Sequence, residues 1–206
     1  MILSLQGCMA VGKTTAVQYL QEHAPYVHIG HEDNRDVIAE IKRRGLEKNT
    51  YEGYVEIQRL WLQKEVARWE KLRAHSCSLM DFGADEIEFY TLNYPKAIGQ
   101  NWEIGCALAD ELETVRQCMP YRILFLDASE QVLRQRKERD QTRSRNFFEF
   151  YLTQLLPLKK EWFFEKENVD VLNVDCLSTE EVGTRVKTWV DLQINRQNGS
   201  GNIWNL

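Results

Sequence analysis

The sequence lacks the patterns that would place the chain in a membrane or in a disulfide-bonded class. None of its apolar runs approaches the roughly 18 residues that a membrane-spanning helix needs. Its five cysteines are odd in number and scattered, without any C-x-x-C spacing. Neither a disulfide framework nor a zinc site is indicated, and free thiols in a reducing cytosol are the simplest interpretation. We therefore expect a cytoplasmic protein without membrane association.

Basic residues are also too few for general binding to nucleic acids. Lys and Arg total 26 against 31 Asp and Glu, which gives a formal net charge of −5. General nucleic-acid binding relies on a basic surface that neutralises phosphates, so no nucleic-acid partner is expected. Repeats, low-complexity blocks and interdomain linkers are absent as well. One domain over residues 1–197 is therefore predicted, with a flexible tail at residues 198–206.

What the sequence does contain is a phosphate-binding motif near its start. The pattern G-x-x-x-x-G-K-[ST] follows the apolar run 1–5 and precedes a helical stretch that begins at Lys13. Between a strand and a helix, the backbone N–H groups of this motif and the N-terminus of the helix face a polyphosphate. The alternative interpretation is an ordinary turn that happens to contain glycine. Lys13 is expected to reach the β- and γ-phosphates, and the Thr14 hydroxyl to hold Mg²⁺. The residues predicted to bind ATP are Gly7, Cys8, Met9, Ala10, Val11, Gly12, Lys13, Thr14 and Thr15.

Strand-like and helical segments alternate along the chain. After the first strand, strands are expected at 26–30, 77–81, 122–127 and 169–174. Helices are expected at 13–23, 34–44, 51–73, 102–118 and 129–166, with a kink at Pro157, a final helix from Ser178, and a loop around 93–95. Such alternation favours right-handed crossovers and a parallel sheet covered on both faces. The predicted fold is α/β, a three-layer P-loop NTPase fold with a five-stranded parallel sheet and a helical lid at about 134–148.

Two strands end in a carboxylate at the edge of the sheet where ligands bind. Asp81 ends the segment Cys77-Ser78-Leu79-Met80-Asp81, and Asp127 ends a similar apolar run. A phosphate loop needs a Mg²⁺ partner on a neighbouring strand, so we assign Asp81 to the metal, with capping of the next turn as the alternative. Ser129 and Glu130 look like a helix start, and Asp127 is therefore interpreted as structural.

Five arginines fall within twelve positions after that strand: Arg134, Arg136, Arg139, Arg143 and Arg145. Three of them, Arg136, Arg139 and Arg143, are spaced i, i+3, i+7 and share one helical face. Guanidinium groups suit phosphate oxygens because they donate in pairs. The predicted role is a lid that closes over ATP and stabilises charge on the transferring group. The alternative is a solvated helix balanced by acidic neighbours.

Candidates for the acceptor side are fewer. Glu32 and Asp33, after the second strand, are the best-placed carboxylates to receive a proton from an acceptor hydroxyl. Gln58 could hydrogen-bond a planar base, with Tyr54 nearby in sequence. Aromatic residues at this density also occur in ordinary cores, so both interpretations stay open.

Taken together, the chain resembles the P-loop nucleoside and nucleotide kinases, most nearly the deoxynucleoside kinase and thymidylate kinase-like group. The motifs that carry the resemblance are Gly7–Thr15 and the stretch from Leu126-Asp127-Ala128-Ser129 through the arginines to Lys160-Glu161-Trp162. The resemblance implies that the arginine-rich segment is the lid, that Glu32 is the base on a sugar hydroxyl, and that Gln58 contacts the base. One departure falls at Phe82, where the family carries an arginine that helps to hold the acceptor.

The leading hypothesis is a Mg²⁺-dependent kinase that transfers the γ-phosphoryl group of ATP to a nucleoside, a nucleotide or a similar hydroxyl acceptor. A phosphate-bearing acceptor would need a second cationic clamp, for which Arg35, Arg43, Arg44 and Arg59 are available. The alternative is a regulatory P-loop ATPase that acts with a macromolecular partner, or a nucleotide-binding subunit without catalysis. A GTPase is disfavoured because the sequence has no Asn-Lys-x-Asp motif. A homodimer stays open as the assembly.

Overall fold

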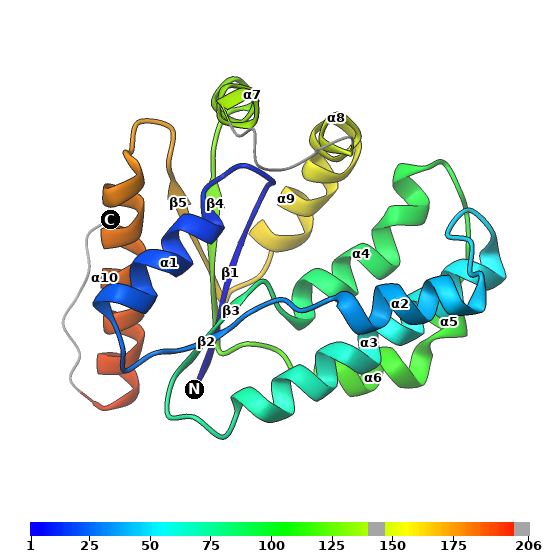
Figure 1. Ribbon diagram of the computed structural model, residues 1–206, viewed down its shortest axis with the longest axis horizontal. Coiled ribbons are helices and arrows are strands. Elements are labelled where there is room, and N and C mark those ends of the chain that lie inside the picture. The colour runs from blue at the N-terminus through cyan, green and yellow to red at the C-terminus, as the bar shows by residue number, and fades with distance from the viewer. Residues whose placement is uncertain (140–146, 200–206) are drawn as a thin grey trace.

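A parallel β-sheet forms the centre of the molecule (Figure 1). The structure is a computed structural model that describes residues 1–139 and 147–199. Within these ranges the sheet has five strands in the order β2-β3-β1-β4-β5, and every neighbouring pair is parallel. The strands are β1 (Ile2–Gly7), β2 (His28–Gly30), β3 (Ser78–Asp81), β4 (Arg122–Asp127) and β5 (Val169–Asn173). The predicted α/β fold with a five-stranded parallel sheet is confirmed.

Strand β1 occupies the middle of the sheet because its sequence is apolar enough to be covered on all sides. All six of its residues are buried. It pairs with β3 on one side, where Leu5 lies opposite Asp81, and with β4 on the other, where Gly7 lies opposite Leu126. The chain order along the sheet reverses at β1, and ligands of open α/β sheets bind at such a point, outside the carboxyl ends of the strands.

Helices cover both faces of the sheet. Helices α1 and α10 pack together on one side, while α3, α4 and α9 lie on the other (Figure 1). The helices before β4 are α1 (Lys13–His23), α2 (Arg35–Arg44), α3 (Tyr51–Leu72), α4 (Ala84–Ala97), α5 (Ile104–Ala107) and α6 (Ala109–Arg116). Those after β4 are α7 (Glu130–Arg139), α8 (Phe148–Phe150), the π-helical turn η1 (Tyr151–Leu155), α9 (Leu156–Phe164) and α10 (Thr179–Gln197). In the part of the chain that is described, none of these helices combines the length and apolar character needed to cross a membrane.

Local sequence explains where several helices begin and end. Ser178 accepts a hydrogen bond from the backbone of Glu181, whose side chain bonds back to Ser178, so the expected capping box opens α10. The Thr50 side chain caps α3 in a similar way. Helix α2 ends at Gly45, which has a φ of +62°.

Aromatic packing fixes α9 against the sheet. Phe125 of β4 and Phe163 of α9 are both fully buried, and their ring centroids lie 5.7 Å apart. Phe89 of α4 contacts Phe163 in turn, with centroids 6.2 Å apart. This contact holds the start of α9 close to the end of β1, which matters for the site below.

Several expected boundaries were wrong. The loop expected around 93–95 belongs to α4, because Pro95 falls in the last turn of that helix, and the Thr91 carbonyl that loses its helical donor accepts from the Tyr54 hydroxyl at 3.1 Å. The helix expected at 102–118 divides at Leu108, whose φ of −123° is not helical. Pro157 lies in the first turn of α9, directly after the π-helical turn η1, so the helical hydrogen-bond pattern changes where the kink was expected.

Candidate functional site

The phosphate loop between β1 and α1 has the backbone conformation of an anion cradle. Gly7 and Gly12 have φ values of +138° and +112°, and Ala10 has a φ of +64°. A Cβ on Gly7 would lie 2.5 Å from the Leu126 carbonyl oxygen, so only glycine fits there. No side chain among the described residues caps the start of α1 at Gly12. Its first N–H groups therefore point to the cavity unpaired, as phosphate oxygens require.

Lys13 lies at the floor of this cradle. Its Nζ donates to the carbonyl oxygens of Gly7 at 3.1 Å and Cys8 at 3.0 Å. Burial, and then the nearby ammonium of Lys159, lower the pKa of Lys13, whereas Asp81 and Glu86 oppose that shift. A half-buried ammonium beside the uncapped start of α1 attracts a polyphosphate.

Cys8 does not add a reactive thiol to the loop. Its side chain is buried, and burial raises the pKa of the thiol to about 11. A protonated, covered thiol is a poor nucleophile. Cys8 instead offers its backbone, whose carbonyl oxygen accepts from Lys13.

A cavity of about 1100 Å³ opens above the loop at the carboxyl ends of the strands. The whole predicted loop, residues 7–15, lines it. The charged side chains that line the same cavity include Glu32, Asp81, Glu86, Arg136, Arg139 and Lys159. The structure thus brings the predicted loop, both predicted carboxylates and two of the predicted arginines to one cavity.

The two predicted carboxylates differ in their surroundings. Asp81 ends β3 beside the loop, and within the described residues no donor contacts its buried Oδ1. Glu32 follows β2, accepts a hydrogen bond from Asn34, and lines the same cavity. Burial within the cleft, and then the Asp81 carboxylate, raise the pKa of Glu32 to about 7. A carboxylate that changes charge near neutral pH suits proton transfer.

The residues present fit a Mg²⁺ ion that is bound together with a polyphosphate. Thr14 begins α1 with an exposed side chain, and the unpartnered Asp81 oxygen lies on the neighbouring strand. Within residues 1–139 and 147–199, no group of three or more His, Cys, Asp or Glu side chains forms a cage for a metal. Mg²⁺ is commonly held by one or two protein oxygens with substrate phosphates and water, so a cage is not required.

The three predicted lid arginines that the structure describes have different surroundings. Arg136 donates to the carbonyl oxygens of Val11 at 2.8 Å and Val174 at 2.7 Å, so it ties α7 to the phosphate loop. Arg139, at the end of α7, is exposed and lines the cavity. Arg134 points elsewhere, because it pairs with Glu130 and Glu149. Arg143 and Arg145, with most of the predicted lid, lie outside the described residues.

Phe82, the predicted departure, is strained and lies at the cavity. Its φ is +45°, an unusual value for a large side chain. Arg68 of α3 supports this turn by donating to the carbonyl oxygens of Phe82 at 2.6 Å and Asp81 at 3.2 Å. Since Asp81 lies in that turn, the strained backbone and Arg68 together fix where its carboxylate points.

The predicted acceptor residues Tyr54 and Gln58 line a second, smaller cavity of about 320 Å³ between α2, α3 and α4. Tyr54 donates to the carbonyl oxygens of Tyr90 and Thr91, and Gln58 accepts from the Thr91 hydroxyl at 2.9 Å. Aromatic side chains, including Trp61, form much of its wall. Because Tyr90 lies one helical turn after Glu86 on α4, the two cavities are neighbours.

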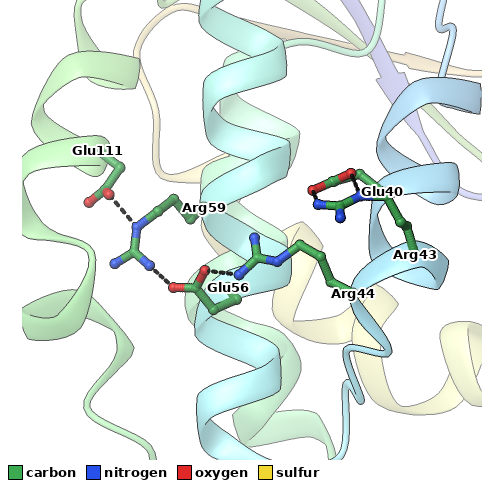
Figure 2. A network of polar contacts seen from close by, with 6 residues as sticks. All are labelled: Glu40, Arg43, Arg44, Glu56, Arg59 and Glu111. Carbon is green, nitrogen blue, oxygen red and sulfur yellow. Dashed lines mark hydrogen bonds and ion pairs between the residues drawn. The ribbon is translucent and has the colours of Figure 1, made fainter.

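The four arginines available as a second phosphate clamp are all paired with carboxylates. Arg44 and Arg59 both contact Glu56, Arg59 also contacts Glu111 at 2.6 Å, and Figure 2 shows this chain of contacts linking α2, α3 and α6. Arg43 pairs with Glu40 on its own helix (Figure 2). Arg35 pairs with Asp33. None of these four guanidiniums is among the described side chains that line either cavity.

Sequence reasoning missed several polar residues of the main cavity, among them Glu86, Tyr151 and Lys159. Glu86 was missed because residues 93–95 were taken as a loop, which hid α4 and its first turn. Tyr151 and Lys159 come from η1 and α9, where a charged residue in a helix is ordinarily solvent-facing. Only the packing of α9 on the sheet reveals that Lys159 points inward.

The sheet order, the loop and the cavity together define the core of a P-loop kinase fold. A solved structure of a deoxyadenosine kinase from M. mycoides, with the products dCMP and a flexible dCDP bound, matches this fold. The match covers 97% of this chain and 100% of that chain, with a TM-score of 0.64 and 14% sequence identity. No family model and no curated protein matches the sequence. The expected resemblance to deoxynucleoside kinases is therefore confirmed at the level of the fold.

Proposed function

We propose that this chain is an ATP-dependent small-molecule kinase that transfers a phosphoryl group to a hydroxyl of a nucleoside-like acceptor. The observation that carries the proposal is the shared cavity, in which an open helix N-terminus and Lys13 lie with the carboxylates of Asp81 and Glu32. Phosphoryl transfer requires a cradle, a metal site, cations and a group that orients the acceptor. The cavity offers a candidate for each.

On the donor side, the chain binds and orients the triphosphate. The N–H groups of the loop and the first turn of α1 donate to phosphate oxygens, and Lys13 exchanges its carbonyl partners for them. Thr14 and Asp81 hold Mg²⁺, which, when bound, neutralises charge on the β- and γ-phosphates. Arg139 adds a cation from α7, while Arg136 keeps α7 attached to the loop.

On the acceptor side, Glu32 accepts the proton of the attacking hydroxyl. Its pKa of about 7 leaves a substantial ionised fraction at neutral pH, together with enough basicity to take the proton. The aromatic cavity with Tyr54 and Gln58 receives the planar part of the acceptor. The likeness in fold to a deoxyadenosine kinase supports an acceptor that carries a base and a sugar.

The charges of the cavity favour a neutral acceptor over one that already carries a phosphate. Glu32 and Asp81, neither of which has a cationic side chain as an ion-pair partner among the described residues, line the cavity where the acceptor hydroxyl would lie and would repel a second phosphate group. The arginines that could have served as its clamp are held by carboxylates instead, as Arg44 and Arg59 illustrate.

ATP consumption measured against a panel of nucleosides, nucleoside monophosphates and simple alcohols tests this function, with a Lys13→Ala variant as the control. Release of ADP that depends on a nucleoside and is lost in the variant is the expected result. Release without any acceptor would instead identify a regulatory ATPase. Preference for a monophosphate would contradict the assignment of a neutral acceptor.

A further inference from the structure

Lys159 is a buried lysine at the floor of the phosphate cavity. Its side chain is only 2% exposed although it carries a charge. The ammonium donates to the Gly7 carbonyl oxygen and to the Tyr151 hydroxyl, both at 3.2 Å, and pairs with Glu86 at 2.5 Å. These two hydrogen bonds use two of the three N–H donors of the ammonium, and the Glu86 carboxylate neutralises its charge. Lys159 is thus held by groups of the protein, and its link to the phosphate loop is the Gly7 carbonyl.

The Gly7 carbonyl is the group that links Lys159 to the phosphate loop. The same oxygen also accepts from Lys13 at 3.1 Å, so two ammonium groups meet at one acceptor. Their like charges repel, and each weakens the attraction of the oxygen for the other. The Gly7 carbonyl consequently binds Lys13 less strongly than it would if Lys159 did not also donate to it.

Stability alone does not account for the ion pair between Lys159 and Glu86. Replacing a buried ion pair by apolar groups of similar volume is often neutral or stabilising. Phe125 and Phe163 already surround the ammonium, with ring centroids 5.9 Å and 5.5 Å from Nζ, so the pocket would accept an apolar side chain. The pair is also nearly neutral as a unit, which limits its direct effect on a bound anion.

We propose that Lys159 is a positioning residue that keeps Lys13 available to the triphosphate by competing for the Gly7 carbonyl. Without Lys159, that carbonyl binds Lys13 alone, and ATP must break a stronger contact to recruit it. Through Lys159, helix α9 thereby influences the affinity of the phosphate loop for ATP, although the loop lies some 150 residues earlier in the chain. The inference rests on the proposed binding of ATP at the loop and adds the residue that tunes it.

Calorimetric titration with Mg·ATP, without any acceptor, tests this inference. The test variant combines Lys159→Met with Glu86→Gln, so that both charges of the pair are removed together. We expect the Kd for Mg·ATP to rise about tenfold in this variant. In a Lys13→Met background the same pair of changes is expected to alter the Kd less than about twofold, because Lys159 acts through Lys13.

Lys160→Met is the matched control. Lys160 is the next residue on α9, but its ammonium pairs with Asp127 at 2.7 Å, away from the loop. This control is expected to keep the wild-type Kd. Thermal unfolding verifies that each variant folds. If the test variant does not fold, Lys159→Gln combined with Glu86→Gln replaces it, because this variant also removes both charges but keeps polar atoms in place.

The outcomes separate this inference from the proposed function. An unchanged Kd in the test variant, or an equal loss with and without Lys13, overturns the role of Lys159 alone. If Lys13→Met binds Mg·ATP as tightly as the wild type, or if the wild type does not bind it, the proposed function itself fails.

Discussion

The guanidinium of Arg68 lies over the ring of Phe82, with its Cζ 5.5 Å from the ring centroid. One of its nitrogens donates to the Phe82 carbonyl at 2.6 Å, and the other end of the group reaches Glu65. This contact joins α3 to the turn that carries Asp81. The resemblance noted in the sequence led us to expect an arginine at the position of Phe82. A guanidinium does lie beside that turn, but it comes from α3 and donates to backbone carbonyls.

Removing this support should cost stability. Arg68→Met leaves the buried Glu65 without its cation and frees two carbonyl groups, so we expect a loss of about 3–5 kcal/mol in the free energy of unfolding. Urea denaturation measures it. Arg73→Met is the matched control on the same helix, because Arg73 is exposed and its pair with Glu70 should contribute less than about 1 kcal/mol. Equal losses in both variants would contradict the account.

Gly7→Ala should damage both the fold and the loop. The added Cβ would meet the Leu126 backbone, and the φ of +138° does not suit alanine, so we expect a loss of about 2–4 kcal/mol. Mg·ATP binding should fall below detection. Gly99→Ala is the control, because Gly99 also has a positive φ but open space around it, and should cost about 1 kcal/mol without affecting ATP.

Asp81→Asn tests the metal site. The amide removes the charge at the unpartnered oxygen but keeps its size, so the Mg²⁺ concentration for half-maximal activity should rise at least about tenfold. Asp127→Asn is the comparison, because Asp127 ends β4, on the other side of β1, but pairs with Lys160. It should keep the wild-type Mg²⁺ requirement. A shift of equal size in both variants would refute the assignment of Asp81.

Glu32→Gln tests the proton acceptor. We expect kcat to fall about 10²–10⁴-fold with little change in ATP affinity. Because Glu32 must be ionised to accept a proton, kcat/KM of the wild type should decline as the pH falls below about 7. Asp33→Asn is the neighbouring control, since Asp33 pairs with Arg35 at the surface. A wild-type profile that stays flat between pH 5.5 and pH 8.5 would argue against Glu32 as the base.

The sequence was sufficient to predict the sheet and the phosphate loop. Buried parallel strands are continuous apolar runs, and the loop needs glycine at Gly7 and Gly12 for backbone conformations that few other residues adopt. Asp81 and Glu32 were predictable because both directly follow strands whose ends must meet at one edge of the sheet.

The remaining residues of the site could not be predicted, because they depend on long-range packing. Lys159 faces inward only because α9 is held by Phe163 against β4. Arg68 reaches the Asp81 turn from a helix that ends before β3 begins. The four arginines of the supposed clamp have their charges met by carboxylates, some of them on other helices, and no pattern of spacing specifies those partners. Arg143 and the centre of the lid stay predictions.

The central claim is that this cavity transfers phosphate from ATP to a small hydroxyl acceptor through Lys13. The most direct measurement is ADP release by the wild type and by Lys13→Ala, each with and without a panel of nucleosides at saturating Mg·ATP. The account predicts release that requires a nucleoside and falls at least about 10²-fold in the variant. ADP release that does not depend on any acceptor, or that is unchanged in Lys13→Ala, would contradict it.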